Sequence, residues 1–338
     1  MALDSGFGLP VQPRALAARM SRVPLVSVVI PHYNESRLLG EAIRSVEAQS
    51  FTDWEIVVVD DGSTLEHRRA IAPLAGPRVR IVEQTNQGPA VASQRAMDLA
   101  RGTYIAFLDH DDLWHPAKLE QDVTALDRHP DLDLVFCGFQ WIDDIGEPIA
   151  APHRAPAERF DARALCIDYC IGPTATVTLR ASAAHAAGTM NPRLRRYYDF
   201  EFFLRVASLR PANVGASRDV LAYYRRHAGQ LSADVALMRA EWTQVLDAIR
   251  KCPGVDDGVV ARAQSNMHRY FAFLQYEQQH FLSGLGLLGQ AFRLAPVAFV
   301  QEPRNWLAGS ACLAGLLLPP RVRAAAQSMV ARQLDSAR

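Results

Sequence analysis

The sequence predicts an α/β protein: a mostly parallel, twisted sheet flanked by helices, followed by an all-helical C-terminal extension. Two observations carry this prediction. Apolar runs typical of buried strands alternate with segments whose apolar residues recur at helical spacing, and beyond about residue 234 only the helical spacing remains. Alternating strands and helices are typical of a parallel sheet that is covered on both faces.

The first predicted element is a strand over Leu25 to Ile30, an apolar run that ends at Pro31. A helix should follow, because Leu38, Ile43 and Val46 recur at helical spacing. The alternation then continues with predicted strands at 55–59, 79–82, 103–108 and 132–139 and predicted helices at 66–74, 89–100 and 116–128.

The second half is less regular. Residues 149–161 are rich in Ala, Pro and Arg without periodicity, which predicts a connecting loop. Beyond it we expect a β segment at 174–179, an amphipathic helix at 197–208 and a short strand at 220–224. The organisation predicted from these elements is a flexible N-terminal arm (1–24), one α/β domain (25–233) and a helical C-terminal region (234–338) with breaks near 253 and 296–303.

Composition excludes several classes of protein. Of the 338 residues, 49% are hydrophobic and 21% are charged, as in soluble globular proteins. The formal net charge of zero argues against nucleic-acid binding, which needs a basic footprint. The five scattered cysteines fit reduced thiols rather than a disulfide framework. No signal peptide or run of about 20 apolar residues is evident, so we expect a cytoplasmic protein.

Polar clusters follow three of the predicted strands where each strand ends. In an open parallel sheet, ligands bind outside the carboxyl ends of the strands, so these clusters should share one edge. The histidines other than His110 and His227, among them His32, are not grouped with other residues as metal ligands would be. The clusters are Pro31-His32-Tyr33-Asn34-Glu35, Asp60-Asp61-Gly62-Ser63 and Asp109-His110-Asp111-Asp112.

The third cluster places three carboxylates within four residues. Such close like charges favour a hard cation that keeps positions open for phosphate, so Mg²⁺ or Mn²⁺ on a diphosphate would fit. The alternative is a turn and helix cap, with Asp112 capping a segment that starts at Leu113. In the other clusters, Asp61 could accept a hydrogen bond from a base or ribose, or form a routine Asp-Gly turn. Tyr33 could stack on a base or simply pack.

Together these segments resemble a known family, the bacterial family 2 of inverting glycosyltransferases with the GT-A fold. The resemblance is ordered and correctly spaced over about Val26 to Phe139, and weaker to about Ser232. It implies a Rossmann-like nucleotide-sugar-binding half (25–140) and an acceptor half (141–233). The segments that carry it are Val26 to Asn34, Gln49 to Ser63, Asn86-Gln87-Gly88 and Asp109 to Asp112.

The resemblance also implies roles for single residues. Asp111 would be the direct ligand of Mn²⁺ or Mg²⁺, with Asp109 near the ribose or sugar and Asp112 supporting. His110 stands where relatives carry a small residue, which bears on the sugar pocket. The implied donor-binding residues are Pro31, Tyr33, Glu35, Asp61, Arg95, Asp109, His110, Arg225 and His227, and the implied metal ligands are Asp111, Asp109 and His227.

An inverting transferase needs a base that accepts the proton of the acceptor hydroxyl. By resemblance this base is Asp199, at the start of a helix, and Glu201 is the alternative. From the residues alone, Asp199 could equally be an acidic residue that the helix dipole stabilises.

The segment Tyr223-Tyr224-Arg225-Arg226-His227, with Ser232 beyond it, resembles a loop that closes over the donor. Arg225 and His227 could offset charge on the departing diphosphate, since negative charge develops there. The alternative is an ordinary basic loop.

The predicted function is therefore transfer of a sugar from a nucleotide-diphosphate donor, with UDP expected, to a glycan or lipid-linked acceptor in polysaccharide or cell-surface glycan synthesis. A nucleotidyltransferase is the first alternative, although no Gly-rich basic loop follows the first strand. An inactive nucleotide-sugar-binding protein is the second.

The helical region presents a further question. Leucine-rich segments there precede the apolar run 306–318 and then Arg321, Arg323 and Arg332. An apolar helix flanked by arginines can lie at the inner face of the cytoplasmic membrane. Packing against the α/β domain, or against a second subunit in a homo-oligomer, is the alternative. The apolar residues concerned are Leu282, Leu285, Leu287, Leu288, Phe292 and Leu294.

Overall fold

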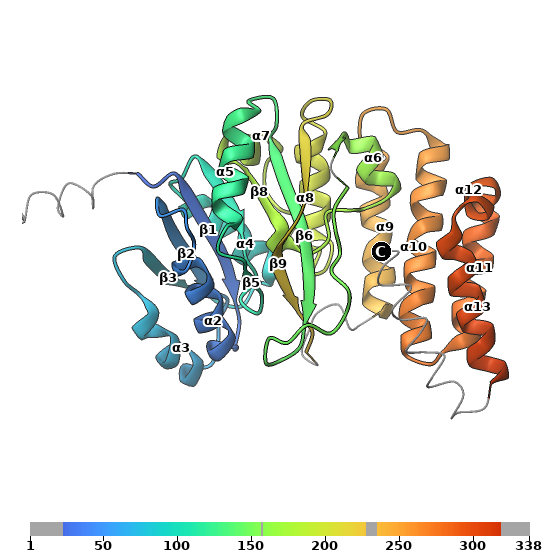
Figure 1. Ribbon diagram of the computed structural model, residues 1–338, viewed down its shortest axis with the longest axis horizontal. Coiled ribbons are helices and arrows are strands. Elements are labelled where there is room, and N and C mark those ends of the chain that lie inside the picture. Colours follow the sequence, from blue (N-terminus) through green and yellow to red (C-terminus); the bar gives the residue numbers. More distant parts are fainter. Residues whose placement is uncertain (1–22, 157, 228–234, 319–338) are drawn as a thin grey trace, which may run out of the picture.

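The computed structural model describes residues 23–156, 158–227 and 235–318. The expected N-terminal arm up to residue 22, Ser232 and the arginines beyond residue 320 therefore lie outside the described residues. Strands and helices are labelled as in Figure 1. The strands are β1 (Val26–His32), β2 (Trp54–Asp60), β3 (Val79–Glu83), β4 (Tyr104–Phe107), β5 (Leu113–Trp114), β6 (Leu134–Ile142), β7 (Arg159–Phe160), β8 (Val177–Arg180) and β9 (Val214–Arg225).

Helices surround this sheet and then continue alone to the end of the described chain. The helices are α2 (Ser36–Glu47), α3 (Leu65–Ile71), α4 (Pro89–Leu99), α5 (Lys118–Arg128), α6 (Ala162–Ile167), α7 (Ala181–Ala187), α8 (Tyr198–Ala207), α9 (Val235–Ile249), α10 (Asp257–Glu277), α11 (Phe281–Leu294), α12 (Pro296–Gln301) and α13 (Pro303–Leu317).

The α/β class is confirmed, and the sheet is a single mixed one. Its order is β3-β2-β1-β4-β8-β6-β9-β5, and β7 pairs with β9. Pairing is parallel from β3 to β4 and between β6 and β9, whereas β8 runs antiparallel to both of its neighbours. The sheet is thus less parallel than the sequence predicted, because an apolar run indicates burial but not strand direction.

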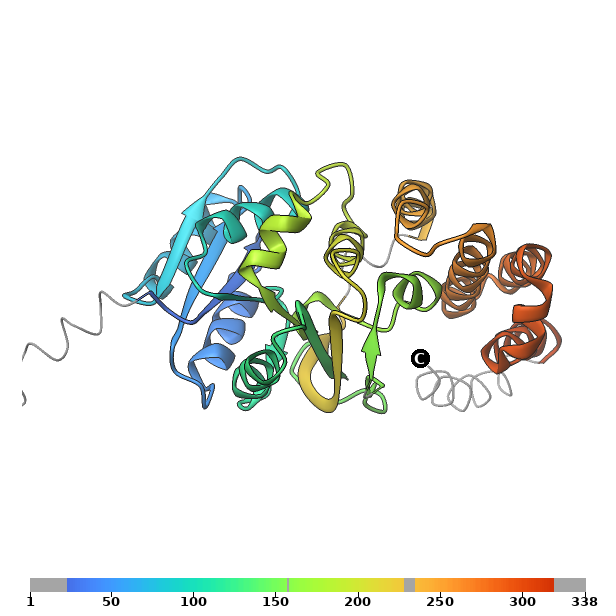
Figure 2. The ribbon, with the colours of Figure 1, turned by 90° about the horizontal axis from the view of Figure 1, so that it is seen from above.

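Helices cover the two faces of the sheet (Figures 1 and 2), and an apolar core lies on each face. Val28 and Ile30 of β1 belong to one core with residues of α2 and α5. Val29, which lies between them in the strand, belongs to the other core with residues of α4 and α8. Side chains alternate across a strand, so a continuous apolar run is what a strand buried on both faces requires.

An ion pair between the buried Glu55 and the half-exposed Arg101 joins neighbouring strands at their ends. Glu55 of β2 accepts hydrogen bonds from Ser27 Oγ of β1 at 2.8 Å and from Arg101 Nε at 3.0 Å. Burial alone would raise the pKa of Glu55, but the hydrogen bonds from Arg101 and Ser27 outweigh it and hold the pKa below its ordinary value. The pair joins β1 and β2 to the turn that leads into β4, and so fixes the relative positions of three strand ends.

Three local predictions need correction. Leu113–Trp114 is strand β5, paired with β9, so the helix-cap interpretation of Asp112 is wrong. The segment 149–161 contains β7, and 181–187 forms the helix α7 that the sequence analysis did not identify. Very short elements carry too few residues for a periodicity to show.

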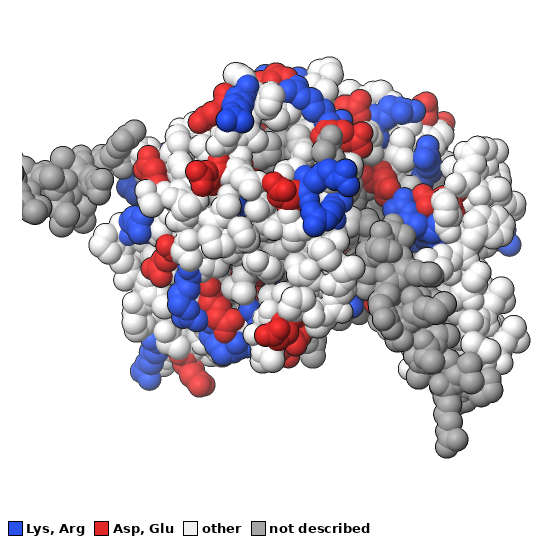
Figure 3. All heavy atoms as spheres, viewed as in Figure 1, with Lys and Arg blue, Asp and Glu red and all other residues white. Residues whose placement is uncertain are grey.

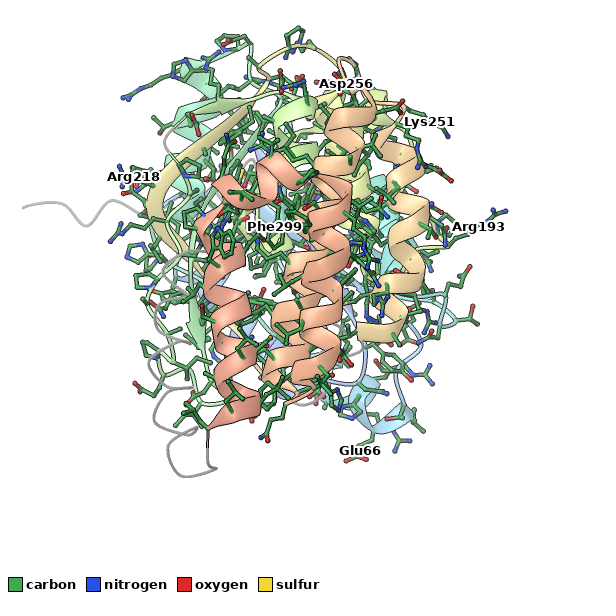
Figure 4. All side chains as sticks on the ribbon, turned by 90° about the vertical axis from the view of Figure 1, so that its right-hand side faces the viewer. Glu66, Arg193, Arg218, Lys251, Asp256 and Phe299 are labelled. Carbon is green, nitrogen blue, oxygen red and sulfur yellow. The ribbon has the colours of Figure 1, made fainter. Side chains whose placement is uncertain are left out.

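The C-terminal helices pack as a layer against the end of the sheet that carries β7 and β9 (Figures 1 and 4). Helix α9 contacts α8, and α10 contacts α6, so these helices continue the core of the α/β part. In the described chain no helix is both long and apolar enough to cross a membrane. The helical extension was therefore predicted correctly in kind, and it also forms one wall of the cavity described next.

Candidate active site

A cavity of 1210 Å³ lies where the ends of β1, β2 and β4 meet the helical layer. All three polar clusters that the sequence analysis singled out contribute to its lining, through Tyr33, Asp61 and Asp111 among others. Asp199, at the start of α8, lines the same cavity, as do residues of α9, α10 and α13. The fold thus brings together residues more than a hundred positions apart.

The Asp109–Asp112 loop after β4 brings several carboxylates into little space. Burial raises the pKa of Asp109 well above its usual range, and the charges of Asp111 and Asp199 raise it further. Burial would also raise the pKa of Asp111, but a hydrogen bond from His227 holds it below its ordinary value. Asp111 is thus the member of the loop that stays ionised, while Asp109 favours the neutral form unless a cation joins it.

His227 provides the direct partner of Asp111. Its Nε2 lies 2.9 Å from Asp111 Oδ2, and this hydrogen bond raises the pKa of the imidazole. Together the two side chains offer an oxygen and a nitrogen at one point of the cavity wall. Among the described residues no group of three or more His, Cys, Asp and Glu side chains is arranged to hold a metal by itself. A cation here would need oxygens from a ligand as well, as diphosphate-bound Mg²⁺ commonly does.

Arg225, which the sequence analysis named as a donor-binding residue, lies behind the carboxylate loop. Its side chain is only 1% exposed and does not line the cavity. Its Nε donates to Asp111 O at 2.9 Å, its backbone N–H donates to Asp112 Oδ1 at 3.0 Å, and its Nη2 pairs with Glu41 at 2.8 Å. Arg225 therefore fixes the shape of the carboxylate loop, while the neighbouring Arg226 and His227 face the cavity.

Asp61 lines the cavity and organises the turn beside it. Its Oδ1 accepts from Gln87 N at 2.8 Å, and its Oδ2 accepts from Gly88 N at 2.8 Å. Gly88 has a φ of 90°, a conformation that favours glycine and explains the Asn-Gln-Gly sequence. Pro31, Tyr33 and Glu35 also line this part, and Tyr33 is 47% exposed, with its ring free to meet a ligand.

Arg95, which the sequence analysis placed near the donor, is not among the residues that line the cavity. Its Nη1 donates to Glu83 O at 3.1 Å and approaches Gln84 Oε1 at 3.3 Å. Gln84 in turn donates to Asp61 Oδ1 at 2.7 Å. Arg95 can therefore act on the site only indirectly, by supporting Gln84.

Two histidines stack at the end of β1. The ring of His110 lies 5.2 Å from that of His32, edge to face, and its Nδ1 is 3.2 Å from Pro31 O. His32 is 1% exposed, and neither ring nitrogen has a hydrogen-bond partner among the described residues. Burial lowers the pKa of His32 to about 3, so it stays neutral. The sequence analysis placed His32 in the polar cluster after the first strand but gave it no role of its own.

Asp199 is the candidate base. Thr174 Oγ1 donates to its Oδ2 at 2.8 Å, and the backbone N–H of Phe200 donates to its Oδ1 at 2.8 Å. Burial raises the pKa of Asp199 although both hydrogen bonds favour the ionised form. A raised pKa suits a carboxylate that must accept a proton.

Glu201, the alternative base, is engaged in an ion pair. It lies outside the cavity lining, and both of its oxygens pair with Arg205 at 2.8 Å. This ion pair lies along the same helix, at i and i+4, and keeps Glu201 away from any ligand in the cavity.

Other lining residues belong to no motif that the sequence analysis used, among them Trp141, Tyr169, Arg196 and Trp242. An aromatic pair, Trp141 and Tyr224, has its ring centroids 4.8 Å apart, and Arg226 stacks on Trp141 at 4.6 Å. Tyr169, Arg196 and Trp242 line the side nearest the helical layer.

Comparison with known proteins shows which family this chain belongs to. The sequence model described as "Glycosyl transferase family 2" matches residues 27–199. An uncharacterised protein of Sinorhizobium fredii is 44% identical over 147 residues, which are 40% of this chain and 16% of that protein. An uncharacterised glycosyltransferase of Rickettsia prowazekii is 27% identical over 68% of this chain and 73% of its own length.

Solved structures share the fold at low sequence identity. Residues 1–349 of TarS of S. aureus in complex with UDP superpose with a TM-score of 0.57 at 18% identity, covering 85% of this chain and 89% of that fragment. The mannosyltransferase PcManGT of Pyrobaculum calidifontis, in complex with GDP-Man and Mn²⁺, gives 0.58 at 18%, covering 92% of this chain and 86% of PcManGT.

Replacement of Arg225 should test its structural role. We expect Arg225→Met to lower the free energy of unfolding by about 3 kcal/mol, because buried carbonyls and Glu41 would lose their charged donor. Arg226→Met is the matched control. It removes a neighbouring arginine whose ion pair with Glu277 is long, at 3.5 Å, and exposed, and it should cost about 1 kcal/mol or less. Urea unfolding measures both, and equal losses would contradict the assignment.

Proposed function

The chain belongs to glycosyl transferase family 2 and shares the GT-A fold with the two solved structures, so we propose that it transfers a sugar from a nucleotide-diphosphate sugar to an acceptor hydroxyl. The transfer would invert the configuration at the anomeric carbon of the sugar. One observation carries the proposal: the Asp111–His227 pair and the candidate base Asp199 line the same cavity. The expected donor is UDP-linked, and the expected acceptor is a glycan or a lipid-linked glycan in polysaccharide or cell-surface glycan synthesis.

The donor would bind at the ends of β1, β2 and β4. Tyr33 offers an exposed ring to the nucleobase. Asp61 holds the adjoining turn and also lines the cavity. Pro31, Glu35 and His110 complete this wall. Neighbours bound to UDP and to GDP-Man support a nucleotide-sugar donor of this kind.

A divalent cation, Mn²⁺ or Mg²⁺, fits beside the diphosphate. Asp111 and His227 would hold it, with Asp109 close by, and the accumulated buried carboxylates favour a positive charge at this point. When bound, such an ion neutralises negative charge on the diphosphate. The Mn²⁺ in the mannosyltransferase neighbour supports this choice of ion.

Asp199 would act as the base. As the acceptor oxygen attacks the anomeric carbon, its O–H proton passes to a carboxylate oxygen of Asp199 and the bond from the sugar to the diphosphate breaks. Thr174 and the backbone N–H of Phe200 hold this carboxylate in one orientation.

The two alternatives are less well supported. A nucleotidyltransferase would need a basic, Gly-rich loop after β1, where this chain has Pro31-His32-Tyr33-Asn34-Glu35. An inactive binding protein would need no oriented carboxylate at Asp199. Transfer and hydrolysis assays with a panel of nucleotide sugars and Mn²⁺ distinguish the three functions.

The metal assignment can be tested by binding. We expect Asp111→Ala to weaken Mn²⁺-dependent binding of UDP at least about tenfold, because an ionised metal ligand of the protein is lost. The fold should stay intact, because removing one carboxylate reduces the repulsion within the loop. Asp144→Ala is the control, since Asp144 is exposed, close in the structure and outside the cavity lining. Isothermal titration calorimetry with and without Mn²⁺ measures both, and unchanged affinity in Asp111→Ala would refute the assignment.

The base can be tested by pH dependence. Asp199→Asn should leave UDP affinity unchanged and lower kcat by at least about 10²-fold. In the wild type, activity should fall as the pH drops through the raised pKa of Asp199, because only the ionised form accepts a proton.

Thr174→Val should move the acidic limb of the pH–activity profile to higher pH, since Thr174 stabilises the ionised form of Asp199. Thr174→Ser keeps the hydroxyl and should leave this limb in place. A limb that stays fixed in Thr174→Val would show that another group titrates.

We also propose that the outer face of α11–α13 contacts a membrane. Leu287 and Leu288 pack inward, but Leu282 is 73% and Leu317 is 79% exposed. From 281 to 317 the charged residues are Arg293, Glu302 and Arg304, and the last two pair with each other at 2.8 Å. This edge of the molecule is accordingly almost free of charge in Figure 3. Large uncharged apolar surfaces mark interaction sites, and a bilayer suits a lipid-linked acceptor.

Vesicle co-sedimentation of the full chain tests this contact. The double variant Trp306→Glu/Leu317→Glu should lose binding to phosphatidylglycerol vesicles at least about tenfold, because two exposed apolar side chains would no longer enter the interface. Ile145→Glu, at an 82% exposed apolar residue in another part of the chain, should bind like the wild type. A dimer that the double variant dissociates, without vesicle binding, would show that the face pairs with a second copy instead.

A further inference from the structure

The cavity extends past Asp199 into a region that no sequence motif predicted. We call this region the helical arm. It lies between the segment before α8 and the helices α9 and α10, and its residues are Tyr169, Arg196, Tyr197, Trp242, Met267 and Tyr270. Phe200 contacts the rings of both Tyr169, at 4.2 Å, and Trp242, at 6.1 Å, so the arm begins at the residue that follows the candidate base.

Polar atoms in the helical arm lack partners. Nε and Nη1 of Arg196, Nε1 of Trp242 and Oη of Tyr169 are all buried without a hydrogen bond to any described residue. Trp242 is only 4% exposed. Buried polar groups in folded proteins almost always have a partner in the protein or in ordered water, so four such atoms in residues that line one cavity call for a partner from outside the described chain.

The chemistry of these atoms indicates the kind of ligand. Arginine and tryptophan nitrogens can only donate, and the tyrosine hydroxyl can donate as well. A neutral hydroxyl could satisfy one of them, but the two adjacent N–H groups of a guanidinium are best met by the oxygens of a carboxylate or a phosphate.

The carboxylates around the helical arm are already engaged. Asp168 pairs with Arg304 at 2.8 Å, and Glu277 with Arg226 at 3.5 Å. Glu241 of α9 accepts the backbone N–H groups of Arg195 and Arg196 at 3.1 and 3.0 Å, and so fixes this segment without pairing with the Arg196 guanidinium. In the described part of the chain, no carboxylate forms an ion pair with Arg196.

We propose that the helical arm binds an anionic group of the acceptor, a carboxylate or a phosphate, through Arg196 with Trp242 and Tyr169. This inference rests on the proposed glycosyl transfer and names the class of acceptor: an acidic glycan rather than a neutral one. Arg196 lies three residues before the candidate base Asp199 and lines the same cavity, and on this ground we assign the anion to the acceptor. The C-terminal helices then take part in acceptor selection through Trp242.

Direct binding of matched probes to the full chain, with UDP and Mn²⁺ present, tests the inference without requiring turnover. The probes are methyl β-glucuronide against methyl β-glucoside, and glucose 6-phosphate against glucose. We expect at least one anionic probe to bind about tenfold more tightly than its neutral partner, the effect of one hydrogen bond to a charged group. Which pair shows the preference identifies the carboxylate or the phosphate.

Variants assign the preference to the helical arm. Arg196→Gln should abolish it and leave the affinities for the neutral probes and for UDP unchanged. Trp242→Phe, which keeps the ring and removes only the N–H, should reduce it severalfold. Arg193→Gln is the matched control, because Arg193 lies three residues earlier and extends outward into solvent (Figure 4).

Equal binding of anionic and neutral probes by the wild type would overturn the inference. So would a preference that survives in Arg196→Gln, or an Arg196→Gln variant that loses UDP binding together with the preference. Absence of UDP binding in the wild type would instead count against the proposed function, and the probe titrations would still decide whether the helical arm selects anions.

Discussion

The site depends on one constraint: several carboxylates have to be buried together at the end of a sheet. Desolvation and mutual repulsion push Asp109 and Asp112 toward their neutral forms, so the arrangement needs positive partners at fixed places. The end of β9 and the residues just beyond it supply them. Arg225 supports the loop from inside the protein, and His227 meets Asp111 at the cavity surface. Residues 114 and 116 positions away from Asp111 in the sequence thus hold the carboxylate loop in place.

The helical layer is joined to the catalytic part by a similar contact. Glu241, a buried carboxylate of α9, accepts hydrogen bonds from the backbone of Arg195 and Arg196. Those residues lead directly into α8, whose first turn carries Asp199. The position of the candidate base therefore depends on α9, which gives the helical region a role in the site as well as in packing.

The half of the fold around β1 to β4 could be predicted from the sequence, because strands buried on both faces give unbroken apolar runs and their polar ends fall at one edge. Strand direction in the other half could not be predicted, since β8 joins β4 and β6 through long-range pairing. Among the candidate residues, chemical type was a poor guide to orientation. Arg225, Arg95 and Glu201 have the right chemistry but are engaged with other protein groups, whereas Arg196 belonged to no motif and His32 was given no role within its cluster.

According to the two proposals, one part of the cavity binds a cation and another part binds an anion. Its carboxylate end, at Asp111, favours a cation and through it a diphosphate, while its donor-rich end, at Arg196, favours an anion. A negatively charged acceptor and a negatively charged donor repel each other, and in a low-dielectric cavity that repulsion is strong. Separate positive charges at the two ends offset it and orient the acceptor with its hydroxyl toward Asp199. An acidic acceptor and a metal-bound diphosphate are therefore compatible in this cavity because its charge is divided between the two ends.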